Sequence, residues 1–206
     1  MSTLERLSSA RGDPSEASNK AVAADALAQP DILDEVAAGL EHADRKLLGD
    51  CVEVFTEVAK VNPALVAPYA DRLIPLLGHK DTRVRWEATH AVALVAALVP
   101  DLIEPLLPDL KAKIECDGSV IVRDCSVIAL GEYGSSGPEA ARQTFPLLKR
   151  ALEAWEGKHA KLALEGMGKL LPVEPALAPS VQTAAQACLD HKRANVRRLA
   201  QKVVQA

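Results

Sequence analysis

The sequence predicts an all-α fold in which about five to six helix pairs stack into a right-handed superhelix. Three observations support this class: a period of 37 or 38 residues, apolar positions spaced as on one face of a helix, and a core poor in aromatic residues. Hydrophobic residues make up 49% of the 206 residues, but aromatic residues only 3%. Small aliphatic side chains favour closely packed helices over a sandwich or barrel of β-branched and aromatic residues.

The period is visible in prolines that follow an apolar helix end. These prolines recur at intervals of 37, 38 and 37 residues, at Pro63, Pro100, Pro138 and Pro175. A second set of positions keeps the same spacing: Leu47-Leu48, Val84-Arg85, Val122-Arg123, His159-Ala160 and Val196-Arg197. Self-similarity at a fixed period of this size is the signature of stacked repeats, so the chain is predicted to form one domain over residues 1–206.

Each unit contains two helical patterns joined by a short turn. One helix face is formed by apolar residues spaced three or four apart, at Val84, Ala88, Ala91, Val92 and Val95. An upstream helix shows the same spacing at Leu65, Tyr69, Leu73, Leu76 and Leu77. Asp81, in the turn between them, is expected to cap the second helix of that unit.

The two ends of the chain depart from the regular unit. Residues 1–28 are predicted to be either an atypical N-terminal helix pair or a flexible arm. Residues 175–206 are predicted to be a C-terminal capping repeat. After Asp190 this repeat carries only basic charges, at Lys192, Arg193, Arg197, Arg198 and Lys202. A polar outer face suits a terminal repeat, and a nucleic-acid patch is the alternative interpretation.

The pattern resembles the HEAT-repeat family of armadillo-like α-solenoids. The resemblance rests on the turn and helix start at 81–85, on Val122-Arg123 followed by Ala129-Leu130-Gly131, and on 195–197. Prolines inside the first helices, such as Pro108 and Pro146, are similar to the kinked first helix of that repeat. The resemblance implies that second helices line one inner surface. It also implies a structural role for Arg85, Arg123 and Arg197, which would donate to acceptors between adjacent repeats.

Several classes of function have little support. The formal net charge of −4 gives no general attraction for phosphate backbones, so nucleic acid is disfavoured as a partner. The four cysteines are scattered without a metal-ligand spacing, and no catalytic motif is present. Histidines that recur near the turns, at His42, His79, His159 and His191, are expected to be solvated. We therefore predict no metal, no cofactor and no catalytic residues.

Targeting and membrane segments are also not indicated. Residues 1–20 lack a basic segment followed by an apolar run, and the most apolar stretch, 91–99, ends at Pro100. A cytoplasmic protein without a membrane partner is expected.

Candidate binding residues lie on the second helices, outside the apolar stripe. They are predicted at Trp86, Glu87, His90, Asp124, Ile128 and Arg198. Trp86 lies about 200° around the helix from Val84, and interfaces favour tryptophan. The alternative is that Trp86 packs over a neighbouring helix. Trp155 is expected to be a packing residue.

The leading hypothesis is a non-enzymatic scaffold that binds a protein or peptide on the surface of its second helices. The alternative is a HEAT-like alkylpurine DNA glycosylase, whose candidate residues would be Trp86, Arg123, Asp124 and Trp155. A third possibility, an accessory subunit of a chromophore lyase, rests on analogy of fold alone. The sequence does not indicate an oligomeric state.

Overall fold

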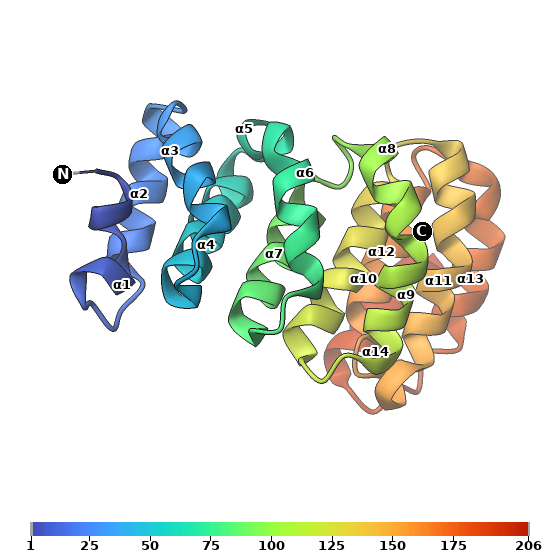
Figure 1. Cartoon of the computed structure of the whole chain (residues 1–206). Helices are drawn as coiled ribbons and strands as arrows, with labels where there is room; N and C mark the ends of the chain where they lie inside the picture. The colour runs from blue at the N-terminus through green and yellow to red at the C-terminus, as the bar shows by residue number, and fades with distance from the viewer. Residues whose placement is uncertain (1, 206) are drawn as a thin grey trace. The chain divides into compact units, whose positions relative to one another are not determined.

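The computed structural model describes residues 2 to 205, and every regular element within that range is a helix. The predicted all-α class is therefore confirmed. The helices form two compact units, one ending at Val95 and one beginning at Ala96. Within each unit, first helices alternate along the chain with second helices (Figure 1).

In the N-terminal unit the second helices are continuous and the first helices are short. The second helices are α2 (Ala17–Ala28), α4 (Arg45–Val61) and α7 (Thr82–Val95). The preceding elements are the 3-10 turn Leu4–Arg6 and α1 (Ser8–Arg11), then α3 (Ile32–Ala38) and the 3-10 turn Gly39–Glu41, then α5 (Pro63–Val66), Ala67–Tyr69 in 3-10 form, α6 (Ala70–Leu73) and Ile74–Gly78 in 3-10 form. Because α4 packs against both α2 and α7, the second helices form a layer of their own.

The C-terminal unit repeats this plan with longer first helices. Its elements are α8 (Pro100–Ile103), the 3-10 turn Glu104–Leu106, α9 (Leu107–Cys116), α10 (Val120–Gly134), α11 (Pro138–Gly157), α12 (Ala160–Leu170), the 3-10 turn Pro175–Leu177, α13 (Ala178–Gln186) and α14 (Ala194–Gln205). The second helix α12 packs against α10 on one side and α14 on the other.

Prolines explain the interruptions in two of the first helices, those of residues 63–78 and 100–116. Pro68, Pro75 and Pro105 each lie in the first turn of a 3-10 segment, where the missing N–H leaves no helical hydrogen bond unmade. Pro146 is different, because it lies inside α11, which continues on both sides of it. A proline in a first helix therefore does not always break it.

The turns before the second helices are capped by polar side chains. Asp44 accepts a hydrogen bond from the amide of Lys46 at 2.8 Å, and Asp81 accepts from the amide of Arg83 at 3.0 Å. Ser119 accepts from the amide three residues further on, at 3.4 Å. These bonds satisfy amides at the helix N-terminus that have no partner within the helix.

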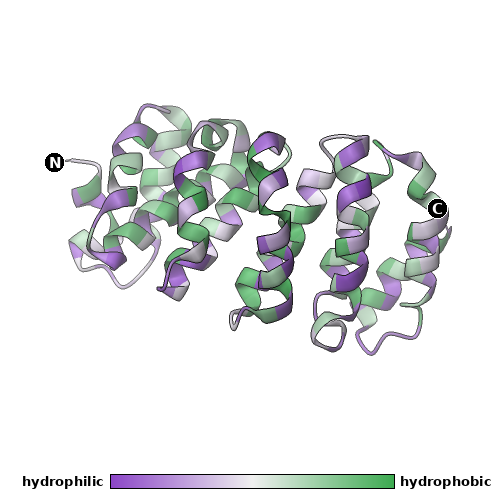
Figure 2. Ribbon diagram, turned by 45° about the vertical axis from the view of Figure 1, so that its right-hand side comes forward, coloured by the Kyte–Doolittle hydropathy of each residue, from purple (hydrophilic) through white to green (hydrophobic). Residues whose placement is uncertain are grey.

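The core of each unit is aliphatic. Figure 2 shows that the more hydrophobic positions lie on helix faces that meet other helices. Three of the cysteines, Cys51, Cys125 and Cys188, are buried in this core, and Cys116 is exposed. Among the described residues, no helix combines the length and apolar character needed to span a bilayer.

Candidate functional site

A repeated arginine ties each of three second helices to the turn that precedes it. The acceptors are the backbone oxygens of His79 for Arg85 (2.8 Å), of Asp117 for Arg123 (2.5 Å) and of His191 for Arg197 (2.7 Å). The acceptor expected from the sequence was in the neighbouring repeat. In each case the structure gives the arginine an acceptor in its own turn, six residues upstream, and Arg123 also shows the expected bond to the neighbouring repeat, to His159.

The turn histidines divide into two kinds. In three turns the histidine Nδ1 accepts the amide two residues further on: His42 from Asp44 (3.0 Å), His79 from Asp81 (3.1 Å) and His191 from Arg193 (3.1 Å). His159 is instead fully buried, so the expectation of a solvated side chain is wrong at this position. Its ring turns inward because two neighbouring side chains on α10 supply partners for both nitrogens.

Those partners are Asp124 and Arg123. His159 Nδ1 lies 2.6 Å from Asp124 Oδ1, and Arg123 Nε donates to His159 Nε2 at 3.2 Å. Because a guanidinium can only donate, Nε2 must be the acceptor, and the ring proton belongs on Nδ1 toward Asp124. The Arg123 guanidinium also lies 3.8 Å from the centre of the Trp155 ring. One carboxylate oxygen of Asp124 is thus committed to holding a buried neutral imidazole.

In the N-terminal unit, the predicted residues Trp86, Glu87 and His90 lie together on α7, and we call them the α7 face. All three are half-buried. Trp86 Nε1 donates to Glu87 Oε1 at 2.8 Å. The neighbouring α4 is joined to this face by Thr56, whose Oγ1 donates to the Glu87 carbonyl at 3.1 Å. The indole is therefore held by the carboxylate next to it and keeps part of its surface open.

Beside the α7 face lies a buried ionic cluster, which the sequence analysis missed. Arg83 Nη2 donates to Asp50 and to Glu53, at 2.7 Å in each case. Asn19 of α2 donates to the same two carboxylates at 3.0 and 2.8 Å, and the Ser9 amide donates to Asp50 at 2.7 Å. This cluster connects all three second helices of the unit.

A signal for part of this cluster was present in the sequence. Glu53 occupies the same position in its repeat as His90, Ile128 and Glu165 in theirs. Extending the repeat alignment one unit upstream from the predicted sites would have identified it. Asn19 gives no such signal, because its role depends on the tertiary position of α1 and α2.

Burial determines the electrostatics of this surface. It raises the pKa of Glu87 and, despite bonds from Asn19 and Arg83, that of Glu53. It also acts to raise the pKa of Asp50, but hydrogen bonds from Ser9, Arg83 and Asn19 outweigh it and hold that pKa below its usual value. The pKa of His90 is lowered, first by burial and then by Lys60. His90 is therefore a neutral neighbour of acidic side chains at physiological pH.

We expect Glu87→Gln to raise the melting temperature at neutral pH. Because the folded chain raises the pKa of Glu87, the stability linked to this group is present below the unfolded pKa and is lost as pH rises through the folded pKa. Glutamine avoids that loss and can still accept the Trp86 N–H. The gain should shrink below pH of about 4.3, the ordinary pKa of glutamate. Thermal unfolding at several pH values measures it, and a gain independent of pH would contradict the assignment.

In the C-terminal unit, Asp124 and Ile128 lie one turn apart on α10. Ile128 lines a hollow of about 390 Å³ between α10 and α12, which we call the α10–α12 hollow. Its other lining residues are Gly131, Leu162, Glu165, Gly166 and Lys169. Lys169 forms an ion pair with Glu132 across the two helices. Arg198 is exposed on α14 and does not line this hollow.

The predicted site residues are thus brought together in part. Trp86, Glu87 and His90 form one face of the N-terminal unit, and Asp124 with Ile128 form one face of the C-terminal unit. Arg198 lies on a different helix. Within residues 2–205, no three His, Cys, Asp or Glu side chains gather in a way that could hold a metal ion.

Comparison with known proteins finds similarity to solved structures and none at the level of sequence families. No protein-family model and no curated protein matches the chain. A designed armadillo repeat protein solved in complex with the peptide (KR)4 is similar at TM-score 0.75 and 17% identity, over 98% of this chain and 97% of that one. A second engineered protein is similar at TM-score 0.74 and 21% identity, over 98% and 96%.

A natural protein shows the same type of fold. The archaeal HEAT-like repeats protein from Thermococcus onnurineus NA1 is similar at TM-score 0.56 and 13% identity, over 91% of each chain. At these identities the likeness concerns the backbone and not the residues of any site. The chain has a HEAT/armadillo-like repeat fold.

Proposed function

We propose that the chain is a non-enzymatic repeat scaffold that binds a protein or peptide on the surface of its second helices. The α7 face carries this proposal. It presents a partly open indole, fixed by a hydrogen bond to Glu87, next to α4, on which Glu57 is half-buried. Tryptophan residues in such settings are common anchors of interfaces.

The charges around the α7 face favour a basic segment as partner. Glu87 and Glu57 lie on adjacent second helices and are both half-buried. The buried carboxylates of Asp50 and Glu53 are already paired with Arg83. Lys60 is the cation that pairs with Glu57, at 2.6 Å. A lysine or arginine of a partner could replace Lys60 at Glu57 and approach Glu87 at the same time. In support, a protein of similar fold was solved with an alternating lysine–arginine peptide.

Trp86→Ala is expected to weaken binding of a lysine–arginine repeat peptide by about 2 kcal/mol, while the fold stays within about 1 kcal/mol of the parent. The substitution removes the contact area that the indole offers to the peptide. Because Trp86 is only half-buried, the substitution removes little core packing. Calorimetric titration and thermal unfolding of the same samples measure the two effects. A loss of about 3 kcal/mol or more of stability would instead identify Trp86 as a packing residue.

Two double variants that remove the same number of charges distinguish binding at the α7 face from non-specific attraction of a basic peptide to an acidic protein. Glu57→Gln with Glu87→Gln removes two acids from the second helices, and Glu139→Gln with Glu153→Gln removes two exposed acids from α11. The first pair should lower the affinity for the lysine–arginine peptide about fivefold, and the second pair should change that affinity little. Equal losses in both would show that the peptide responds to net charge only.

The DNA glycosylase alternative has one observation in its favour. Three of its four candidate residues, Arg123, Asp124 and Trp155, lie together in the C-terminal unit. The hydrogen bond from His159, however, occupies one carboxylate oxygen of Asp124, which leaves only the other oxygen to contact a water molecule. Release of free base from alkylated duplex DNA would favour this alternative over the scaffold. Failure to bind duplex DNA at about 50 mM salt would remove it.

A further inference from the structure

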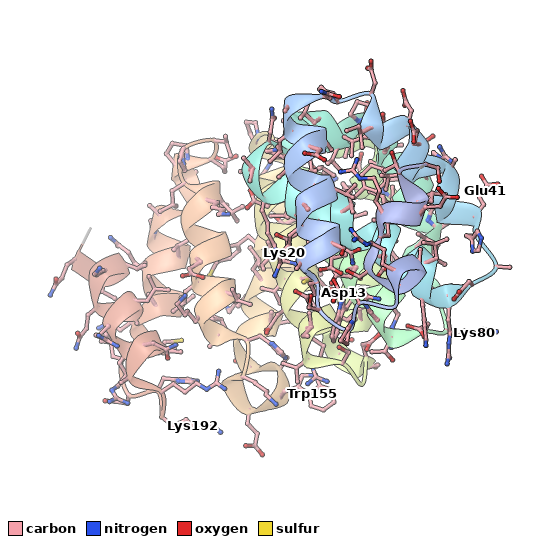
Figure 3. All side chains as sticks on the ribbon, turned by 90° about the vertical axis from the view of Figure 1, so that its left-hand side faces the viewer. Asp13, Lys20, Glu41, Lys80, Trp155 and Lys192 are labelled. Carbon is pink, nitrogen blue, oxygen red and sulfur yellow. The ribbon has the colours of Figure 1, made fainter. Side chains whose placement is uncertain are left out.

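A second pocket lies in the C-terminal unit, at residues that precede α12 and α14. It has a volume of about 320 Å³ and is lined by Trp155, Glu156, Lys158, Lys192 and Arg193. These residues come from the end of α11, where Trp155 and Glu156 leave the helical conformation, from the connection to α12 and from the turn before α14. Figure 3 shows Trp155 and Lys192 on the same edge of the unit. We call this cavity the turn pocket.

Trp155 is held so that one of its two faces stays available. Its Nε1 donates to the backbone oxygen of Ile114 at 2.8 Å, and the Arg123 guanidinium covers one face of the ring. The residue is nevertheless 46% exposed. Trp155 is also one of the residues that line the turn pocket, so part of its exposed surface borders the pocket.

The backbone that presents the indole is strained. Trp155 and Glu156 have φ of 52° and 56°, a left-handed conformation that costs non-glycine residues about 1–3 kcal/mol each. Gly157 follows at φ 75° and packs so closely on His191 that a Cβ there would lie 2.4 Å from its Nε2. The two turns are thus locked against each other, and the pocket between them is preformed.

The turn pocket is basic in a chain that is acidic overall. Lys158, Lys192 and Arg193 face one acid, Glu156, which lies 3.1 Å from Lys192. Arg193 uses one nitrogen to donate to the Lys158 backbone oxygen at 2.6 Å, which leaves other guanidinium N–H groups for a ligand. The helix α12 begins at Ala160 without a side-chain cap, because His159 is turned inward, so its positive end adds to this field.

We propose that the turn pocket binds a nucleoside phosphate, with the base stacked on the open face of Trp155 and the phosphate held by Lys158, Lys192 and Arg193. A flat aromatic surface beside several cations fits a ligand that joins a planar ring to an anion. The volume suits one base with its phosphate and is too small for a helix or folded segment. A free nucleotide and the end of a single-stranded nucleic acid share this chemistry.

Calorimetric titrations with AMP, ATP, adenosine and inorganic phosphate test the proposal directly. AMP should bind more tightly than adenosine or phosphate alone, and ATP more tightly than AMP. If AMP binds no better than phosphate, or none of the four binds, the proposal is wrong. A phosphorylated oligothymidylate that binds about tenfold more tightly than AMP would identify nucleic acid as the source, and weaker binding would identify the free nucleotide.

Variants test whether AMP binds in the turn pocket. One of them is expected to increase the affinity for AMP, a result that an unfolded variant could not produce. Glu156→Gln removes the acid that opposes the three cations of the pocket, and it should raise the affinity for AMP about threefold. The affinity for AMP should fall at least about tenfold in the double variant Lys158→Ala with Lys192→Ala. It should not change in the charge-matched control, Lys111→Ala with Lys169→Ala. If Glu156→Gln weakens AMP, or if the two lysine pairs behave alike, AMP does not bind in this pocket. Peptide binding to the α7 face should be unchanged by Glu156→Gln.

Discussion

Gly131→Ala is expected to lower the free energy of unfolding by about 2–3 kcal/mol. The helices α10 and α12 approach each other at Gly131 and Gly166, and a Cβ on Gly131 would lie 2.7 Å from the Gly166 Cα. Backbone cannot move aside as a flexible side chain could, so the two helices must separate and lose packing. Chemical denaturation of the variant measures the change.

Gly168→Ala is the matched control for this prediction. Gly168 lies on the same helix α12, and a Cβ there would meet no atom within 4 Å. Alanine favours a helix over glycine by about 1 kcal/mol, so this variant should be slightly more stable than the parent. If Gly131→Ala is also stabilising, the close approach of the two helices is not present in solution.

Arg123→Ala is expected to lower the free energy of unfolding by about 3 kcal/mol, more than Arg85→Ala, for which about 1–2 kcal/mol is expected. Both substitutions remove the donor to a turn carbonyl. Arg123 is buried and also donates to the buried His159 and stacks on Trp155, so its loss leaves more groups without a partner. Arg123→Lys should recover little, since an ammonium cannot reproduce the planar, directed donors.

Parallel denaturation of the two alanine variants checks this ranking. A larger loss at Arg85 than at Arg123 would contradict the account of the His159 contact. Unchanged stability of both, together with lost peptide binding, would make these arginines partner contacts.

The repeated helix pairs could be predicted from the sequence because they depend on the regular spacing of prolines and apolar residues along the chain. Prolines at Pro63, Pro100, Pro138 and Pro175 each stand at the first residue of a helix or 3-10 segment, as the period predicted. Prolines alone could not place the interruptions within first helices, since α11 continues through Pro146 and leaves the helical conformation only at Ala154, Trp155 and Glu156. Tertiary packing determines whether a proline bends a helix or ends it.

The site could be predicted only in part, because burial of polar groups depends on neighbours far along the chain. Trp86, Glu87 and His90 share a face because they lie on one helix, which helical spacing alone requires. The buried cluster of Asp50, Glu53 and Arg83 is held partly by Asn19, more than 30 residues away. The inward turn of His159 likewise requires Arg123 and Asp124 from the preceding repeat.

The most direct test of the scaffold proposal is hydrogen–deuterium exchange of the chain with and without a bound lysine–arginine peptide. The account predicts that the peptide slows exchange on the second helices, within residues 82–98 and 119–135, and that Trp86→Ala abolishes the effect in the first of these segments. Slower exchange confined to the turns, with residues 82–98 unaffected, would contradict binding at the α7 face.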